Sequence, residues 1–434
     1  MNLPNTSVNN MALLKLASAR RVLLLQGPIG PFFYDLAACL EERGREVHKV
    51  NFNGGDWRFF RNAQLYRDGL EQWPKALTAI LSEFKPDVCV MFGQDRPVHR
   101  AARCVLTQAN IPTLVFEEGY VRPQFVTFEV GGVNALSRFN WSRHWPGMPA
   151  FKPRSQPAGV AERSFALPFK TVAALAMEHQ MFLSCSRPWF SRYEHHRSFS
   201  VAWESVCWVR SGLRKLGAKS ADAKQIQALL EHHSKRYFLV PLQVQNDSQL
   251  RFYSGFASVD HFIAHVLQSF AQHAAMDYKI VFKHHPMDRG HCNYQATIDR
   301  EAHALGLAGR VGYLQDGHLP DLLDHATGTV LVNSTVGLSS LWHGTPVKVC
   351  GQAMYDLNGL TYQASLDQFW RAPGGVDRQA FASFRAQLIA QTQLPGSFYW
   401  PNKAYAGLLD AVSQAVANLS LTTTGRLQTA GERP

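Results

Sequence analysis

The 434-residue sequence lacks the features that mark secreted and membrane-spanning proteins. Its seven cysteines form no C-x-x-C pair, and their odd number argues against a disulfide framework. No apolar run reaches the roughly 20 residues that a transmembrane helix needs. The apolar run near the N-terminus has no charged segment ahead of it and leads into a predicted strand instead of a cleavage site. We therefore expect a protein of the reducing cytoplasm.

Signatures of nucleic-acid, dinucleotide and metal binding are missing as well. The chain carries 44 basic and 33 acidic residues, a net charge of +11, yet the basic residues form no dense run and no nucleic-acid-binding module is recognisable. The sequence has no G-x-G-x-x-G and no D-x-D motif. The charge excess therefore suits an anionic membrane surface or a phosphorylated substrate better than nucleic acid.

Strand and helix patterns alternate in two series. The first series places strands, with the loops that follow them, at 21–27, 46–56, 85–93 and 111–119, and the second at 236–243, 278–286, 310–314, 328–333 and 345–351. Helical apolar spacing fills the intervals, as at 31–44 and 259–274. Such alternation predicts parallel sheets with functional loops at the carboxyl ends of the strands. We predict an α/β protein with two Rossmann-like domains facing a cleft.

Residues 138–217 break this alternation and hold twelve Lys or Arg against four Glu. We predict four segments: a Rossmann-like domain at 1–137, a basic aromatic helical insertion or linker at 138–225, a second Rossmann-like domain at 226–390, and a C-terminal helix and tail at 391–434. Aromatic residues beside basic ones suggest a surface that meets an anionic membrane; an alternative is that they fill a helical core. The residues concerned are Trp141, Trp145, Trp189, Phe190, Trp203 and Trp208.

Two adjacent carboxylates, Glu117 and Glu118, fall where the strand at 111–119 ends. An open parallel sheet binds ligands at this edge, and one of two crowded carboxylates usually has its pKa raised. The pair suits nucleophilic or acid/base catalysis. The alternative is a solvated loop that happens to carry two glutamates.

The stretch KHHPMDRG (283–290) follows another predicted strand and offers Lys283, two imidazoles and Arg289 around a proline turn. These groups suit a phosphate leaving group, since charge-assisted hydrogen bonds to phosphate are strong. A metal site is the competing interpretation. It is disfavoured because adjacent histidines point in different directions and no H-x-x-x-H or cysteine partner is near.

The stretch NSTVGLSSLWHGTPV (333–347) begins a predicted helix with Asn333 or Ser334 at its N-cap. The Ser334 and Thr335 hydroxyls there suit a phosphate or carboxylate, while a plain N-cap needs no ligand. Two further loops, QGPIGPF (26–32) and QVQNDSQL (243–250), either join the rim of the site or are ordinary turns.

Taken in order, QGPIGPFF with VNFNGGDW, FEEGYVRP, VPLQVQNDSQL, FKHHPMDRG and NSTVGLSSLWHGTPV resemble the KpsS/LipB family of capsule polysaccharide proteins, the β-Kdo transferases. The resemblance runs from about residue 21 to about residue 370 and rests on several blocks together. It implies a GT-B glycosyltransferase that moves Kdo from CMP-β-Kdo to a phosphatidylglycerol-type lipid with retention. This transfer starts the poly-Kdo linker of a capsule polysaccharide.

The resemblance also implies roles for individual residues. The acidic motif falls on Glu117, Glu118 and Gly119, with Glu118 as nucleophile and Glu117 orienting it or tuning its pKa; relatives often carry Glu-Asp here. The His-Pro motif falls on His285 and Pro286. The implied catalytic residues are Glu118, Glu117 and His285; the donor-binding ones are Lys283, Pro286, Asn333, Ser334, Thr335, Gln243, Asn246 and Asp247; and those of the rim or acceptor side are Gln26, Gly27, Gly30, Asn53, Gly54 and Arg122.

The resemblance implies no metal and no cofactor, because CMP-Kdo is a substrate. It implies a cytoplasmic protein on the inner face of the membrane, with a poly-Kdo extending transferase and an ABC exporter as possible assembly partners. Two other classes stay open. One is a GT-B transferase that uses another CMP sugar, in the manner of a sialyltransferase. The other is a non-catalytic capsule export component, against which the paired acidic and His-Pro motifs argue.

Overall fold

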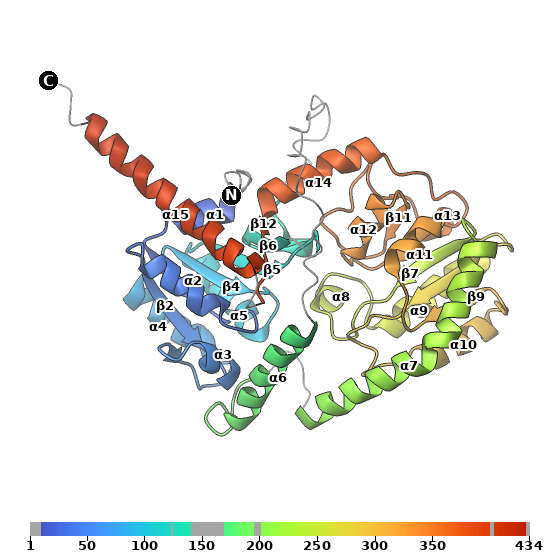
Figure 1. Ribbon diagram of the computed structural model, residues 1–434, viewed down its shortest axis with the longest axis horizontal. Helices are drawn as coiled ribbons and strands as arrows, with labels where there is room; N and C mark the ends of the chain where they lie inside the picture. Colours follow the sequence, from blue (N-terminus) through green and yellow to red (C-terminus); the bar gives the residue numbers. More distant parts are fainter. Residues whose placement is uncertain (1–9, 123–124, 140–168, 195–200, 400–402, 431–434) are drawn as a thin grey trace. The chain divides into compact units, whose positions relative to one another are not determined.

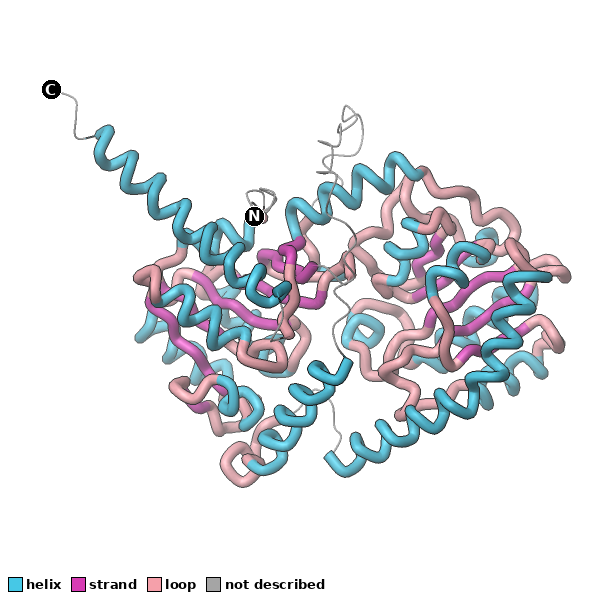
Figure 2. The backbone as a smooth tube through the Cα atoms, in the orientation of Figure 1, coloured by secondary structure: helices cyan, strands magenta, loops and turns pink. Residues whose placement is uncertain are grey.

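The computed structural model describes residues 10–122, 125–139, 169–194, 201–399 and 403–430. The chain divides into two compact units, Met1–Val201 with Arg385–Pro434, and Ala202–Phe384. Each unit has its own sheet and its own hydrophobic core (Figures 1 and 2). The predicted α/β class with two parallel-rich sheets is confirmed.

The first unit is built on a seven-stranded sheet of order β12-β6-β5-β4-β1-β2-β3. The five strands from β5 to β3 run parallel, β6 pairs antiparallel with β5, and β12 pairs antiparallel with β6 at the edge of the sheet. The strands are β1 Arg21–Leu24, β2 Glu46–Asn51, β3 Gln64–Leu65, β4 Val88–Phe92, β5 Thr113–Glu118, β6 Phe125–Val130 and β12 Gln393–Pro395. The alternation of the sequence predicts β1, β2, β4 and β5 but not β3, β6 or β12.

Helices pack on both faces of this sheet because their apolar residues recur at helical spacing. They are α1 Met11–Ser18, α2 Phe32–Glu41, α3 Gly54–Phe59, α4 Trp73–Phe84, α5 Pro97–Gln108 and α15 Lys403–Ala430. Helix α6, Phe169–Cys185, packs against α3, and a 3-10 turn, η2, lies at Asn134–Leu136. The apolar run before β1 does not lead straight into the strand. It forms α1, capped by the Asn10 side chain, and packs against α15 and β6.

The second unit has a five-stranded, fully parallel sheet of order β11-β10-β7-β8-β9. The strands are β7 Tyr237–Pro241, β8 Lys279–Lys283, β9 Val311–Leu314, β10 Gly328–Leu331 and β11 Val347–Val349. The helices are α7 Val201–His232, α8 Ser248–Phe252, α9 Val259–His273, α10 Gln295–Ala304, α11 Leu319–His325, α12 Val336–Trp342, α13 Leu366–Phe369 and α14 Arg378–Thr392, which continues into the first unit. Buried aromatic residues such as Phe238, Phe270 and Trp370 form the centre of its core.

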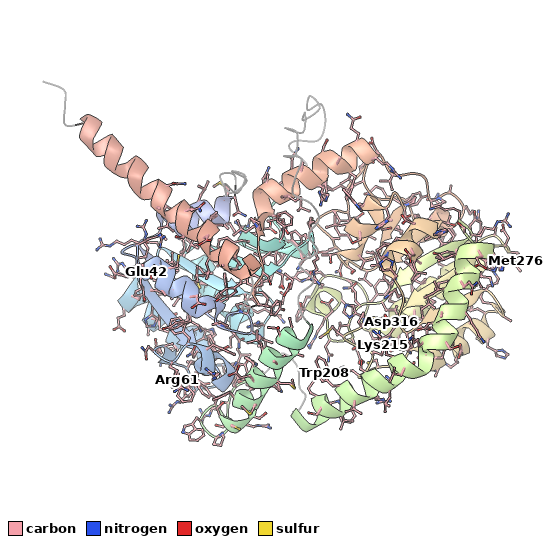
Figure 3. All side chains as sticks on the ribbon, viewed as in Figure 1. Glu42, Arg61, Trp208, Lys215, Met276 and Asp316 are labelled. Carbon is pink, nitrogen blue, oxygen red and sulfur yellow. The ribbon has the colours of Figure 1, made fainter. Side chains whose placement is uncertain are left out.

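Helix α7, within the stretch predicted as an insertion, is fastened along one face to the loops after β8 and β9. Arg214 Nη1 donates to the carbonyls of Arg289 and Cys292 at 2.5 and 2.6 Å. The Asp222 carboxylate accepts the backbone N–H of Asp316 at 2.9 Å. Lys215 Nζ lies 3.0 Å from Asp316 Oδ2, and Figure 3 shows the two side chains together. None of the described helices combines the length and apolarity that a bilayer crossing needs.

The tightest point of this attachment gives a stability prediction. A Cβ on Gly290 would lie 2.0 Å from the Cys207 carbonyl oxygen, so Gly290→Ala forces α7 away from the loop after β8. We expect a loss of about 1–3 kcal/mol in the free energy of unfolding. Gly212→Ala, at an open position of α7, is the matched control and should stabilise by up to about 1 kcal/mol. Equal urea midpoints for the two variants would contradict the tight packing.

Candidate functional site

The two glutamates at the end of β5 have different surroundings. Successive side chains of a strand point to opposite faces, so the carboxylates are not side by side. Glu117 Oε2 lies 3.5 Å from the position that a Cβ on Gly93 would take, at the end of the neighbouring β4. On the other face, the Tyr399 hydroxyl donates a 2.8 Å hydrogen bond to Glu118 Oε1. The expected crowded pair is therefore two separate carboxylate sites.

Burial is the main reason why the pKa of Glu117 is raised to about 7. The charge of Glu118 adds to the rise, whereas the hydrogen bond from the Glu118 backbone N–H to Glu117 Oε1, at 3.0 Å, lowers the pKa. The guanidinium groups of Arg96 and Arg122 lower it too. Desolvation, more than the adjacent carboxylate that the sequence suggests, thus holds a proton on Glu117 near neutral pH.

The backbone around Glu118 is fixed from two sides. The Thr127 hydroxyl donates to the Glu118 carbonyl at 3.0 Å, and Arg122 Nε donates to the Gly119 carbonyl at 3.1 Å. A Cβ on Gly119 would approach the Phe125 carbonyl oxygen to 2.0 Å, so only glycine fits where the chain turns out of β5. Arg122, predicted for the acceptor side, thus lies beside the acidic motif.

A second polar cluster of the first unit gathers three predicted rim residues. Gln26 Nε2 donates to both carboxylate oxygens of Asp56 at 3.2 Å and to the Tyr193 hydroxyl at 3.1 Å. Asn53, fully buried, caps α3 by accepting the Asp56 N–H at 2.9 Å, and Gly54 is the first residue of that helix. Asp56 and Tyr193 were not predicted. The Asp56 signal was available, since Asn-x-x-Asp opens a helix after a strand.

Arg96 connects this cluster with the glutamates and was also missed. Its Nη1 donates to the Gly27 carbonyl at 2.9 Å, and its guanidinium lies 5.2 Å from the centre of the Phe92 ring. Its charge acts on Glu117. Gly30, at a φ of 111°, lies in the turn before α2. Functional residues are expected in the loops at the carboxyl ends of parallel strands, and GQDRP (93–97) is such a loop after β4. Applied to β4, this expectation would have found Arg96.

Two buried titratable residues flank the same sheet edge. Lys49 donates from Nζ to Asn51 Oδ1 at 3.0 Å, and burial lowers its pKa to about 8. His99 contacts the Gly93 carbonyl through Nδ1 and accepts the Gln26 N–H through Nε2 at 3.2 Å. Burial, with the nearby charge of Arg96, lowers the pKa of His99 to about 3. The imidazole is therefore neutral and serves as a structural hydrogen-bonding group.

In the second unit, the loop after β8 separates the two histidines of the KHHP stretch. His284 is buried, with Nδ1 2.7 Å from the Tyr313 hydroxyl, and burial lowers its pKa to about 4. His285 is partly exposed, and Pro286 is exposed. Lys283, the last residue of β8, is buried, and burial lowers its pKa from the ordinary lysine value. Of the two imidazoles, His285 is therefore the more exposed, and its Nδ1 accepts the Met287 N–H at 3.2 Å.

The loops after β7 and β10 meet through their side chains. Gln243 Nε2 donates to Asn333 Oδ1 at 3.0 Å and to Asp247 Oδ2 at 3.1 Å, and the Asn333 N–H donates back to Gln243 Oε1 at 3.2 Å. Asp247 also caps α8, and Asn246 is exposed beside it. These predicted donor-binding residues are brought together, and the buried amides fix the two loops to one another.

Ser334 and Thr335 precede α12 on the same sheet edge. The Ser334 hydroxyl accepts the Val336 N–H at 3.2 Å, and the Tyr355 hydroxyl donates to the Ser334 carbonyl. The N-cap of α12 is Thr335, not Asn333 or Ser334 as predicted, and it makes no side-chain capping bond. Among the residues that the structure describes, no group of three or more His, Cys, Asp or Glu side chains could hold a metal ion.

A family model described as "Capsule polysaccharide biosynthesis protein" matches residues 87–399, and this chain belongs to that family. The match takes in the carboxylates at the end of β5, the loop after β8 and Tyr399.

Within the family, the chain is 40% identical over 394 residues to the capsule polysaccharide export protein KpsS of Escherichia coli, covering 89% of this chain and 99% of that protein. It is 38% identical over 404 residues to the capsule polysaccharide modification protein LipB of Neisseria meningitidis serogroup B, covering 89% and 94%. Among solved structures, the β-Kdo 2,7 transferase KpsC of Thermosulfurimonas dismutans matches with a TM-score of 0.39 and 12% identity, over 92% of this chain and 99% of that one.

The raised pKa of Glu117 predicts a pH-dependent stability. A carboxyl whose pKa rises from 4.5 to about 7 on folding binds its proton more tightly in the folded state, so its contribution is present at low pH and is lost as the pH rises through 7. Glu117→Gln removes this loss. Between pH 5 and pH 8 the unsubstituted chain should therefore lose about 2 kcal/mol in its free energy of unfolding that the Glu117→Gln variant does not lose. If urea titrations gave the same stability difference between the variant and the unsubstituted chain at both pH values, the raised pKa of Glu117 would be contradicted.

Proposed function

We propose that this protein is a retaining β-Kdo glycosyltransferase that moves Kdo from CMP-β-Kdo to a phosphatidylglycerol-type lipid and starts the poly-Kdo linker of a capsule polysaccharide. Membership of the capsule polysaccharide biosynthesis family supports the setting. The observation that supports the chemistry is the pair of carboxylates at the end of β5, Glu117 and Glu118. Glu118 accepts a hydrogen bond from Tyr399, whereas the pKa of Glu117 is raised to about 7.

Retention by double displacement needs one carboxylate that attacks the anomeric carbon and is later released. In the proposal, a Glu118 oxygen forms a bond to the anomeric carbon of Kdo while the bond from that carbon to the CMP phosphate breaks, and CMP leaves with the electron pair. The acceptor hydroxyl then attacks the same carbon while the bond from that carbon to Glu118 breaks, Glu118 leaves as a carboxylate, and the hydroxyl proton passes to the solvent. Glu117 orients Glu118 by accepting its backbone N–H at 3.0 Å.

The second unit supplies the groups for the nucleotide in this proposal. His285 and Lys283, at the end of β8, stabilise the phosphate of the departing CMP by charge-assisted hydrogen bonds. Ser334 and Thr335, after β10, bind phosphate or the Kdo carboxylate. In this proposal the Lys283 ammonium and the hydrogen-bond donors beside it stabilise the phosphate without a metal, so chelators should leave the activity intact.

Two alternatives remain and are separable by assay. A GT-B transferase for another CMP sugar would hydrolyse or transfer that sugar and not Kdo. A non-catalytic export component would transfer neither. Incubation with CMP-β-Kdo, or with CMP-sialic acid, and a fluorescent phosphatidylglycerol acceptor distinguishes all three by the labelled product.

We expect Glu118→Gln to abolish Kdo transfer while CMP binding persists, because the amide keeps the shape of the side chain but is no longer an effective nucleophile. Transfer is measured with CMP-β-Kdo and the fluorescent lipid, and CMP binding by calorimetry. Glu117→Gln is the matched control and should keep measurable transfer. Near-normal turnover by Glu118→Gln would place the nucleophile elsewhere.

We further propose that the protein binds the anionic inner face of the cytoplasmic membrane through α7. The face of this helix opposite its packed side exposes Val206, Val209, Leu213 and Leu216 at helical spacing, and their exposures run from 53 to 72%. Of the four basic residues within 201–220, Arg214 and Lys215 contact the loops after β8 and β9, which leaves Arg210 and Lys219 exposed for an anionic surface. Basic residues near an anionic surface contribute about 1 kcal/mol each, and apolar side chains add an anchor.

The aromatic residues predicted for this surface differ in exposure. Trp189, Trp203 and Trp208 are exposed, with Trp208 labelled in Figure 3, whereas Phe190 is buried and belongs to a core. Trp141 and Trp145 lie outside the described residues. A membrane surface on α7 would bring the enzyme to its lipid and would also suit assembly with an extending transferase and an ABC exporter.

Flotation with phosphatidylglycerol vesicles tests the membrane proposal. We expect Val209→Ser, Leu213→Ser and Leu216→Ser together to lower the floated fraction several-fold while transfer to a detergent-soluble acceptor survives. Met276→Ser is the matched control, since Met276 is 79% exposed in the same unit but lies off α7. Binding that is indifferent to both the triple variant and ionic strength would rule out α7 as the membrane surface.

A further inference from the structure

The residue that contacts Glu118 comes from the far end of the chain. After the whole second unit, the backbone returns to the first sheet as β12, which pairs antiparallel with β6. Four residues beyond the end of this strand, Tyr399 places its hydroxyl 2.8 Å from Glu118 Oε1. No sequence motif marks this contact, and the carboxylate and the hydroxyl are 281 residues apart.

The neighbouring residue fixes Tyr399 in place. Phe398 is 1% exposed, and its ring packs edge-on against Phe32 and Phe92, each with a centroid distance of 5.1 Å, and against Phe116 at 5.8 Å. Phe116 lies two residues before Glu118 on β5 and therefore points to the same face. The Phe398 anchor thus brings the Tyr399 hydroxyl to the face on which the Glu118 carboxylate lies.

The same segment also supports the Glu118 backbone. Gln393 of β12 donates from Nε2 to the Thr127 hydroxyl at 3.0 Å, and that hydroxyl donates to the Glu118 carbonyl at 3.0 Å. Gln393 Oε1 accepts the N–H of Tyr120 at 2.9 Å, just past the acidic motif. The C-terminal segment that follows the second unit therefore holds Glu118 at two points. Tyr399 contacts the Glu118 carboxylate, and Gln393 supports the Glu118 carbonyl through Thr127.

We propose that Tyr399 is a positioning residue that holds the Glu118 carboxylate in one orientation for attack on the sugar. This inference rests on the proposed function, and it assigns to the C-terminal segment a share in the reaction. A phenolic hydroxyl donates one hydrogen bond, so it directs one oxygen of Glu118 toward itself and leaves the other for the anomeric carbon. Preorganised groups of this kind favour a productive geometry without reorganisation during the reaction.

The charges around the contact keep Tyr399 a donor. Burial and the adjacent Glu118 carboxylate raise the pKa of Tyr399 well above the ordinary tyrosine value, and Glu117 adds to the rise. Arg122 is the opposing charge. The phenol is therefore protonated over the whole range in which the enzyme is assayed.

Tyr399→Phe tests the positioning role by removing one oxygen atom. We expect kcat for Kdo transfer to fall about 10- to 100-fold, as for loss of a hydrogen bond to a charged group, while KM for CMP-β-Kdo stays within about twofold. Tyr405→Phe is the matched control, because Tyr405 lies in the same C-terminal segment and donates to the carboxylate of Asp35. The control should lose stability and keep its kcat.

A double-mutant cycle of Tyr399→Phe with Glu118→Ala in thermal unfolding reports the contact without any substrate. We expect Tm shifts that are not additive. Additive shifts, an unchanged kcat for Tyr399→Phe, or an equal loss of kcat in Tyr405→Phe would each overturn the inference. Failure of the proposed function is seen separately, because in that case the unsubstituted chain transfers no Kdo.

Discussion

The alternation of side chains along one strand, β5, separates the two carboxylates on which the account of this protein depends. Because Glu117 and Glu118 point to opposite faces, one is desolvated near Arg96 and the other meets Tyr399. Two identical side chains thus acquire different proton affinities and different partners. A tight turn at Gly119, which no larger residue fits, ends the strand directly after them.

Much of the sheet architecture could be predicted from the sequence, since buried parallel strands are apolar runs followed by turn residues. The loops after β5, β8 and β10 were found in this way. Strand β12 was not, because it has only three residues and its pairing with β6 joins segments far apart in the chain. Tyr399 was missed for the same reason. Arg96 could have been found by applying the loop rule to β4.

The sequence indicates where the site residues lie better than it indicates their pKa values. The sequence suggests that two adjacent glutamates raise one another's pKa, yet burial is the larger cause, and burial depends on tertiary packing. Basic and aromatic composition likewise singles out residues 138–217, but it does not show which of these residues pack against the protein and which are exposed. In the structure, one face of α7 holds the loops after β8 and β9 through Arg214 and Asp222, and the opposite face is exposed and apolar.

In the proposed reaction Glu118 carries the sugar between donor and acceptor, and mass spectrometry can detect this covalent intermediate. The protein is mixed with CMP-β-Kdo without acceptor, denatured, and examined by mass spectrometry before and after proteolysis. We predict a mass increase of one Kdo that maps to the peptide containing Glu118 and is absent from Glu118→Gln. No adduct in the unsubstituted chain, or an adduct on another residue such as Tyr399, would contradict the account.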